Sequence, residues 1–300
     1  MSLVGSSESL VLSFVSGVWM DQSFPLKPSY QHLVQGLYKA QANTVDFQHR
    51  ADEVKDEINR WAENETKGLI EDLVSRLSGD LRIVLANALS FKGTWERMFD
   101  VSRTRNRDFH QLDGEKVSVP FMTSAYSQFF GSFDGFKLVK IPYQKGEDGR
   151  QFSMYIFLPN ERDGLQNLVQ ELESNHWFLH QLSNLRKVQL SAFLIPKFKF
   201  SYDFESEAII KGLGLTRPFE PRGELTEIST CSDNKFLHFS KVIQNCYIEV
   251  NEEGTEAAAA TITGLTGCSR YSVPPPKPTF VADHPFVFMI MEETSDSLEL

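Results

Sequence analysis

The run from Arg82 to Ser90 constrains the fold most, because it is a nearly continuous apolar run rich in branched residues and alanine. This composition is typical of a strand that is buried on both faces inside a sheet. Further strand-like runs are predicted at Leu10–Met20, Ala42–Phe47, Val117–Met122, Phe136–Pro142, Phe152–Leu158, Val188–Ile195, Lys197–Tyr202, Phe236–Val250 and Phe280–Met291. The chain is therefore expected to build around extensive sheet.

Helical patterns interrupt these strands without a regular order. The clearest pattern is an apolar stripe near helical spacing opposite a charged face, formed by Val54, Ile58, Trp61, Leu69, Ile70 and Leu73. Shorter helices are predicted at Ser29–Ala40, with Ser29 as the N-cap, at Leu165–Leu182 and at Phe204–Leu213. Because strands outnumber helices and do not alternate with them, an α+β architecture is expected. No repeat or flexible linker divides the 300 residues, so residues 1–300 are predicted to form one domain.

Charge and cysteine content narrow the classes of partner and compartment. The net charge is −10 and basic residues do not cluster, which argues against a nucleic-acid partner. No apolar run reaches the length of about 18 residues that a membrane helix needs. The three cysteines are Cys231, Cys246 and Cys268, too few and too widely spaced for a disulfide framework or a zinc site. Such sparse cysteines suit a reducing compartment.

The amino terminus gives a second indication of location. It lacks a basic segment, and Ser16 and Gly17 interrupt the first apolar stretch, so no signal peptide is predicted. A cytoplasmic or nucleocytoplasmic location is expected, with an extracellular location as the alternative.

No catalytic set is found. The motifs G-x-S-x-G, H-E-x-x-H and C-x-x-C and a phosphate-binding glycine loop are absent from the sequence. His176 and His180 have the spacing of paired metal ligands, but apolar residues separate them and no third ligand is evident. Gly212-Leu-Gly214 follows a helix and is interpreted as its end. We therefore expect no enzyme activity, metal or cofactor.

The segment Ile248–Gly264 is the most unusual part of the chain. It follows a good strand, and only alanine and threonine occur between Ala257 and Thr261. Local propensity favours a short alanine helix capped by Thr255. The alternative is an extended loop of small side chains, continued by Leu265–Pro278, which is too polar and proline-rich to pack.

Four separated motifs resemble the serpin family, in its plant form. They are Asn87-Ala-Leu-Ser-Phe-Lys-Gly-Thr-Trp95, Val119-Pro-Phe-Met-Thr-Ser124, Glu252-Glu-Gly-Thr-Glu-Ala-Ala-Ala-Ala-Thr261 and Phe280-Val-Ala-Asp-His-Pro-Phe286. Their order and spacing agree with the family from Leu10 onwards. The resemblance implies a large mixed central sheet, flanking helices, and an exposed reactive-centre loop near Gly254–Pro278. It also implies suicide-type inhibition of a serine or papain-like cysteine protease, whose cut loop inserts into the sheet.

The residues of the small-side-chain segment suit that mechanism. Thr255, Ala257, Ala259 and Thr261 alternate by two, so in a strand they point to one face, and all are small enough to be buried there. Gly254 supplies a pivot. The resemblance implies a hinge made of Glu253, Gly254, Thr255, Glu256, Ala257, Ala258, Ala259, Ala260 and Thr261.

The resemblance also suggests the scissile bond and the sheet-opening region. Family spacing puts the bond between Cys268 and Ser269, and Arg270-Tyr271 is the nearest alternative, which would suit a trypsin-like protease. The sheet-opening residues implied by the family are Asn87, Gln244 and His284.

Three departures from the family favour an alternative function. The helices and strand that precede Leu10 in the family and the strand that follows Leu300 have no counterpart in the sequence. Gln244-Asn245 stand where a histidine-lysine pair is usual. The alternative is a non-inhibitory serpin relative that lost activity with these elements.

Overall fold

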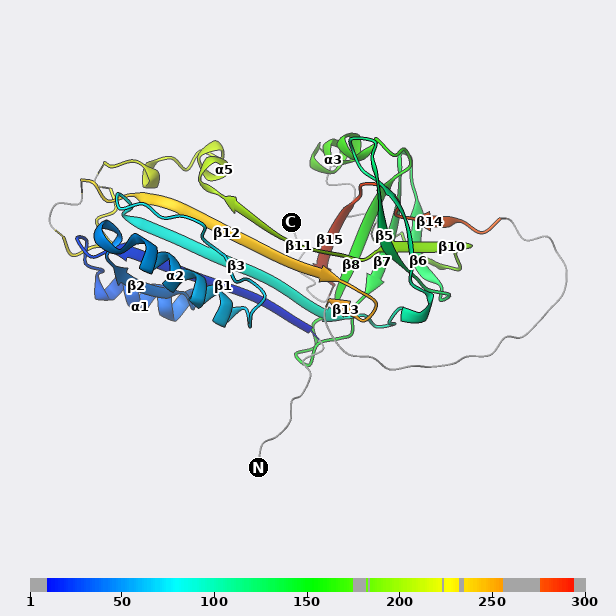
Figure 1. Ribbon diagram of the computed structural model, residues 1–300, viewed down its shortest axis with the longest axis horizontal. Coiled ribbons are helices and arrows are strands. Elements are labelled where there is room, and N and C mark those ends of the chain that lie inside the picture. The colour runs from blue at the N-terminus through cyan, green and yellow to red at the C-terminus, as the bar shows by residue number, and fades with distance from the viewer. Residues whose placement is uncertain are drawn as a thin grey trace, which may run out of the picture. The chain divides into compact units, whose positions relative to one another are not determined.

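A computed structural model describes residues 10–174, 182, 184–222, 224–231, 235–255 and 276–293. They group into two compact units (Figure 1). Unit 1 contains the described residues of Met1–Val11, Lys92–Phe198 and Glu249–Leu300, and unit 2 contains those of Leu12–Phe91 and Lys199–Ile248. The expected single domain stays a prediction.

The largest sheet is mixed, with the strand order β11-β12-β3-β1-β2 and β13 paired to β3. Its strands are β1 (Leu10–Asp21), β2 (Gln41–Val45), β3 (Ile83–Thr94), β11 (Phe198–Glu205), β12 (Phe239–Val250) and β13 (Gly254–Thr255). β1 pairs with β2 in parallel, and β12 pairs with β3 in parallel. β13 pairs with β3 in the antiparallel direction. This arrangement confirms the predicted large mixed sheet.

Helix starts in unit 2 follow local chemistry. α2 (Phe47–Glu65) begins where the Asp46 carboxylate accepts a hydrogen bond from the backbone N–H of His49, at 2.9 Å. α1 (Pro28–Leu37) begins one residue earlier than predicted, with Lys27 as the N-cap and no side-chain cap. The predicted Ser29 cap is wrong because Pro28, which has no N–H to satisfy, already suits the first helical position.

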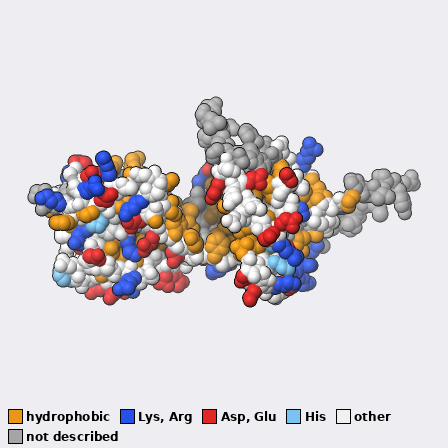
Figure 2. Space-filling model, turned by 90° about the horizontal axis from the view of Figure 1, so that it is seen from above, with side chains coloured by type: hydrophobic (Ala, Val, Ile, Leu, Met, Phe, Trp, Pro, Cys, Tyr) orange, Lys and Arg blue, Asp and Glu red, His pale blue; other side chains and the backbone are white. Residues whose placement is uncertain are grey.

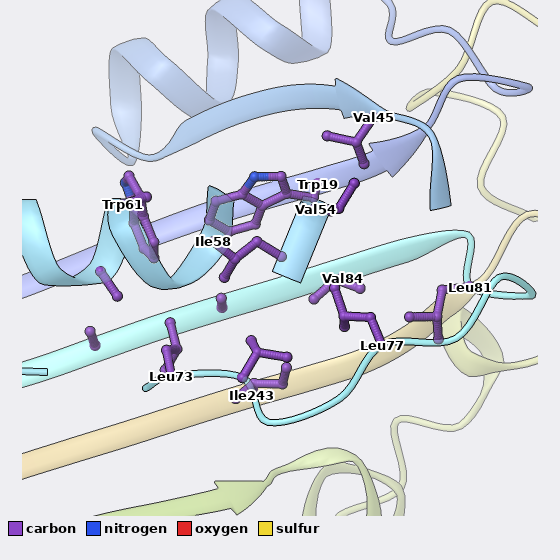
Figure 3. Packing of buried hydrophobic residues seen from close by; sticks show 14 of the residues in the cluster. Trp19, Val45, Val54, Ile58, Trp61, Leu73, Leu77, Leu81, Val84 and Ile243 are labelled. Carbon is purple, nitrogen blue, oxygen red and sulfur yellow. The ribbon is translucent and has the colours of Figure 1, made fainter. Parts of the chain in front are cut away.

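The core of unit 2 lies between α2 and the long strands (Figure 3). Trp19 from β1 meets Trp61 from α2 edge to face, with ring centroids 4.9 Å apart. Ile58 of α2, Val84 of β3 and Ile243 of β12 belong to the same buried cluster. Figure 3 shows these side chains in the space between the helix and the strands. Val45 of β2 belongs to the cluster as well, so apolar burial joins one helix to four strands.

The predicted long helix is shorter than its apolar stripe. α2 ends at Glu65, and the Thr66 hydroxyl donates to the Ala62 carbonyl and accepts from the N–H of Ile70. Ile70 and Leu73 are buried in the cluster from an irregular segment. The helical periodicity therefore predicted correctly that Ile70 and Leu73 are buried in the core. It wrongly placed them in the helix, which ends before them at Glu65.

β3 is not buried evenly on both faces. Val84, Ala86 and Ala88 are fully buried on the face that meets α2. On the other face, Leu85, Asn87 and Leu89 are half-buried. The strand that is buried at every position is β8 (Phe152–Pro159), in the other unit. The apolar run therefore predicted correctly that β3 is a central strand. The predicted burial of both faces is confirmed for one face and only in part for the other.

Unit 1 contains two antiparallel-rich sheets, with strand orders β14-β10-β5-β4 and β15-β8-β7-β6-β9. Their remaining strands are β4 (Arg105–His110), β5 (Lys116–Thr123), β6 (Gln128–Ser132), β7 (Phe136–Pro142), β9 (Arg186–Val188), β10 (Ala192–Pro196), β14 (Thr279–Val281) and β15 (Val287–Glu292). The predicted strand Phe280–Met291 is two strands, because Pro285 lacks a ladder donor. The predicted strand Val188–Ile195 is likewise divided between two sheets.

Short helices complete the described chain. They are η1 (Val101–Arg103), α3 (Leu165–Ser174), α5 (Glu207–Gly212) and η2 (Arg217–Phe219). α3 buries Leu168 in a cluster with Phe136 and Phe157. The histidines His176 and His180 lie outside the described residues.

Three further features of the described residues bear on possible binding partners: surface charge, membrane-spanning helices and groups of metal-binding side chains. On the face shown in Figure 2, acidic and basic side chains are interspersed. Among the helices of the described ranges, none combines the length and apolarity that spanning a bilayer requires. Within the same ranges, histidine, cysteine and carboxylate side chains form no group of three that could hold a metal ion.

Candidate functional site

The site forms where β12 ends and the chain turns back along β3. The side-chain oxygen Oδ1 of Asn251 accepts hydrogen bonds from the N–H groups of Glu253, at 3.0 Å, and Gly254, at 3.2 Å. The N–H of Asn251 donates to the carbonyl of Gly254 at 2.9 Å. This tight turn reverses the chain, so β12 runs parallel to β3 while β13 runs antiparallel to it.

Gly254 is required at the turn for two physical reasons. Its φ is +144°, a backbone conformation that other residues rarely adopt. A Cβ atom on Gly254 would lie 2.0 Å from the carbonyl oxygen of Gly93 and 2.6 Å from Cα of Thr94. Close approach of two backbones therefore explains why the pivot is glycine.

Thr255 is extended and pairs with Gly93. The alternative of an alanine helix capped by Thr255 falls on residues outside the described ranges and stays a prediction. The rest of the predicted hinge, Glu256–Thr261, lies outside the described residues, as do Cys268, Ser269, Arg270 and Tyr271. The scissile bond therefore stays a prediction.

Trp95 holds the turn from the β3 side. Its indole Nε1 donates to the carbonyl of Asn251 at 2.9 Å, and its backbone N–H donates to the carbonyl of Glu253 at 2.8 Å. The ring is fully buried and stacks on Tyr143, with centroids 4.3 Å apart and planes 17° apart. Since a buried indole N–H needs a partner, this side chain ties the position of the turn to the core.

Glu252 forms a buried ionic latch beside this tryptophan. It is only 4% exposed, and its carboxylate lies 2.7 Å from the Lys197 ammonium and 2.6 Å from the Thr104 hydroxyl. Its backbone carbonyl accepts from the N–H of Phe99 at 2.7 Å. Burial opposes ionisation, but the hydrogen bonds from Lys197 and Thr104 and the charge of Lys197 outweigh it and lower the pKa of the carboxyl.

The predicted sheet-opening residues are divided between two places. Asn87 of β3 is the register partner of Gln244 of β12, on the half-buried face of these strands. The amide of Gln244 contacts the thiol of Cys246, with nitrogen and sulfur 3.8 Å apart. His284 belongs to unit 1, where Nδ1 lies 2.8 Å from the Asp283 carboxylate and Nε2 lies 2.9 Å from the Pro159 carbonyl.

Asn245 has a larger bonding role than its neighbour Gln244. It is 1% exposed, its amide nitrogen donates to the Asp203 carboxylate at 2.7 Å, and its oxygen accepts from the Ser201 hydroxyl at 2.9 Å. Asp203 and Ser201 lie on β11, so this side chain links β12 to its outer neighbour. The bond is made on the opposite side of β12 from β3.

Sequence reasoning missed most of the side chains that hold the turn. Trp95 and Glu252 lie inside two of the motifs that carry the family resemblance, and that was the available signal for them. Asn251 is recognisable as a turn residue just after a strand. Lys197 and Thr104 carried no local signal, because their role depends on contacts with a residue far along the chain.

The contacts of the turn fix the path of the chain between β12 and β13. The turn places Gly254 and the buried Glu252–Lys197 ion pair beyond the end of the parallel β3–β12 ladder, and Gly254 and Thr255 already pair with β3.

Comparisons with known proteins agree with this geometry. The family model "Serpin (serine protease inhibitor)" matches residues 2–299. Serpin-ZX of Hordeum vulgare is 45% identical over 280 residues, which cover 93% of this chain and 70% of that protein. Serpin-Z10 of Arabidopsis thaliana is 45% identical over 291 residues, 95% of this chain and 74% of that protein.

Solved structures show the same fold. The native stressed conformation of Arabidopsis AtSerpin1 superposes with a TM-score of 0.83 at 42% identity, covering 94% of this chain and 72% of that one. Uncleaved ovalbumin superposes with a TM-score of 0.76 at 26% identity, covering 96% of this chain and 75% of that one.

Proposed function

The chain belongs to the serpin family of protease inhibitors, and on this premise we propose that it traps its target by inserting a cleaved reactive loop between β3 and β12. The observation that carries the proposal is β13. Gly254 and Thr255 already pair with β3 in the antiparallel direction, at the point where the β3–β12 ladder has ended. A loop that continued in this direction would run antiparallel to both strands.

The chemical step belongs to the target protease. Its serine or cysteine nucleophile attacks the carbonyl of Cys268, the Cys268–Ser269 bond breaks, and Ser269 leaves as a new amino terminus. The protease is then held as an ester or thioester on Cys268. This chain contributes the loop that is cut and the sheet that receives it, and contributes no acid or base.

Insertion would replace the hydrogen-bond ladder between β3 and β12 with two ladders, one from the inserted loop to each of these strands. The β3–β12 ladder from Phe239 to Tyr247 would open, and each strand would then bond to the inserted loop. About ten additional ladder bonds, at roughly 1 kcal/mol each, contribute on the order of 10 kcal/mol. This equals the whole stability of a typical protein, so insertion is strong enough to distort a protease held at the end of the loop.

The protease class and the compartment are finer parts of the proposal. A small or thiol-bearing residue at Cys268 suits a protease with a narrow specificity pocket, and cutting at Arg270 would instead suit a trypsin-like enzyme. Papain-like cysteine proteases form the same kind of acyl intermediate as serine proteases. The sparse cysteines support a reducing, intracellular location for the encounter.

The first experiment mixes the purified chain with trypsin-like, chymotrypsin-like and papain-like proteases. Denaturing gels and mass spectrometry then follow the products. A band at the summed mass that survives denaturant is expected, with cleavage mapped to Cys268–Ser269. Clean cutting that leaves the protease fully active at every ratio would contradict the proposal and favour a non-inhibitory relative.

A matched pair of variants tests insertion directly. Ala259→Arg puts a charge on the face that must be buried, and Ala258→Arg puts the same charge on the opposite face. Ala259→Arg should turn the chain into a substrate that is cut without trapping, while Ala258→Arg should keep most of the trapping. Equal behaviour of the two variants would contradict the alternation on which the proposal depends.

A second pair tests the pivot. Gly254→Ala adds a Cβ atom against Gly93, whereas Gly149→Ala adds one at a φ of +84° with no atom within 4 Å. Both variants carry the strain of positive φ, but only Gly254→Ala should shift the outcome from trapping to cutting. If both change trapping alike, strain in general and not the pivot is responsible.

A further inference from the structure

A row of arginines lies along the outer strand of the β14-β10-β5-β4 sheet. Arg103 ends η1, and Arg105 and Arg107 follow on β4. All three are exposed. They border a hollow of about 400 Å³, whose other lining residues include Phe121, Thr123 and Leu194 from β5 and β10. The hollow therefore has a basic rim above a floor of mixed apolar and hydroxyl-bearing residues.

Strand register explains why the arginines share one face. Arg105 pairs with Phe121 and Arg107 pairs with Val119, so these four side chains point to the same side of the sheet. Arg105 is oriented by its own backbone, since its guanidinium donates to the carbonyls of Ser102 and Thr104 at 2.7 Å each.

The acidic side chains nearby do not neutralise the row. Asp100 is the carboxylate next to it, and its pKa is lowered first by a hydrogen bond from Ser102 and then by the charges of Arg103 and Arg105. Asp108 points to the other face of β4 and pairs there with Lys116 at 3.6 Å. Three arginines against one carboxylate leave the rim positive.

β4 also offers backbone groups. The backbone groups of successive residues in a strand point to opposite neighbours. The carbonyl of Pro120 accepts from the N–H of Lys197 on the β10 side of β5, so the backbone groups of Val119 and Phe121 point to the other side, toward β4. The backbone N–H and carbonyl groups of Arg105 and Arg107 therefore bond to β5. Those of Asn106 and Asp108 point to the outer edge of β4. Further along the same edge, the N–H of His110 donates to the carbonyl of Asp283 at 2.8 Å, so the part of the edge that concerns a partner is the part beside Asn106 and Asp108. β4 is the last strand of its sheet, and this edge can accept another strand.

We propose that this edge and its arginine row bind an extended acidic peptide segment of a partner protein, with carboxylates at every second residue. An added strand bonds to the outer groups of Asn106 and Asp108 and repeats its side chains every two residues, about 6.8 Å. The same repeat separates Arg105 from Arg107. Glutamate or aspartate at alternate positions therefore meets the arginines, while the other side chains point away from them.

An extended peptide suits the site better than a compact anion. A free phosphate would use one or two guanidinium groups and none of the strand edge, whereas a strand uses both. Binding at this edge requires neither cleavage of the reactive loop nor its insertion, so the proposal stands independently of the inhibitory mechanism.

The test uses a fluorescent decapeptide of alternating threonine and glutamate and the full chain, with binding followed by fluorescence anisotropy at low salt. A peptide of the same composition, with the glutamates in one block, is the control for charge alone. The alternating peptide should bind at least about 5-fold more tightly, and added salt should weaken its binding. Equal affinity for the two peptides would overturn the proposal.

Two variants locate the site. Arg103→Gln combined with Arg107→Gln removes two of the rim's three guanidinium groups and spares Arg105, whose guanidinium donates to the backbone carbonyls of Ser102 and Thr104. Affinity for the alternating peptide should fall roughly 3- to 10-fold. Arg60→Gln combined with Arg76→Gln removes two exposed arginines from the other unit and should leave affinity unchanged. An equal loss in both double variants would show nonspecific attraction and overturn the proposal.

Backbone pairing is tested with two more peptides, each N-methylated at alternate amides. One set of amides faces β4 and the other faces solvent, so only one of the two peptides should lose binding. If both bind as well as the parent peptide, the edge is not used and the proposed strand addition is wrong. Thermal unfolding of each protein variant confirms that the fold is intact.

Discussion

Two regions near the long strands are held by different physics. Around Trp19 and Ile58, side chains from α2 and four strands form an apolar cluster. Around Glu252, a carboxylate, an ammonium, a hydroxyl and an indole N–H fix a short turn through directed bonds. The first region gains stability in proportion to the area it buries. The second gains less but specifies one geometry.

The difference suits a sheet that must open at one end. Apolar attraction is non-directional, so the cluster under α2 depends on the area buried and the fit of the side chains rather than on single directed contacts. A buried ionic latch tolerates no displacement, because separating Glu252 from Lys197 leaves a charge without its partner. The apolar cluster under α2 therefore contributes more to stability, whereas the Glu252–Lys197 ion pair contributes less but fixes the geometry of the turn.

The largest expected effect is in the apolar region. Ile58 is fully buried, so Ile58→Ala should lower the free energy of unfolding by about 2–5 kcal/mol through lost transfer energy and a cavity. Leu33→Ala removes a half-exposed side chain from α1 and should cost within about 0.5 kcal/mol. Urea unfolding measures both. A smaller loss for Ile58→Ala than for Leu33→Ala would contradict the assignment of the core.

The next effect is in the latch. Glu252→Gln keeps the shape of the side chain but removes the charge that Lys197 and Thr104 bind, so it should cost about 1–3 kcal/mol. Lys197→Met should cost a similar amount, because it leaves Glu252 buried and ionised. In a double-mutant cycle, the combined variant should lose less than the sum of the two. Additive losses would show that the two side chains do not act as a pair.

The latch should also make stability depend on pH. Because the folded-state pKa of Glu252 is lowered from its ordinary value of 4.5, its carboxylate contributes stability above that value. The contribution is lost progressively as the pH falls below 4.5 and through the folded-state pKa. Unfolding free energies of the wild type and Glu252→Gln should therefore converge toward acid. A constant difference between about pH 6 and about pH 3 would contradict the coupling.

The smallest effect is expected at Thr104. Thr104→Val removes the hydroxyl that donates to Glu252 and should cost about 0.5–1.5 kcal/mol, because Lys197 still holds the carboxylate. Thr104→Ser keeps the hydroxyl and should recover most of the loss. Thermal unfolding of the pair gives the comparison, and equal stability of valine and serine variants would show that the hydrogen bond contributes nothing.

The strands that the sequence predicted best were those with a clear apolar signal. The strand predicted at Phe136–Pro142 has those bounds in the structure, and the one predicted at Val117–Met122 is one residue longer at each end. β4 was missed because Arg105, Asn106, Arg107 and Asp108 carry no apolar pattern, although the strand completes a sheet. An edge strand with one exposed face needs little burial, so its pairing is invisible to hydropathy.

The hinge shows the same division. The structure places Gly254 and Thr255 of the predicted hinge against β3, and the role of its small, alternating residues stays a prediction from composition and family resemblance. The partners of Glu252 were not recognisable from the sequence, since Lys197 lies 55 residues before it (252 − 197) and Thr104 lies 148 residues before it. Nothing local to either residue distinguishes it from other exposed lysines and threonines.

The sequence by itself determined the family, the mixed sheet, the strands with apolar runs and the composition of the hinge. Each of these depends on properties that neighbouring residues express together: periodicity, side-chain size and backbone freedom. Only the tertiary structure decided that β13 already pairs with β3, that Glu252 is locked by Lys197 and Thr104, and that three arginines line an open strand edge. These features depend on contacts between distant residues, which exist only once the chain has folded.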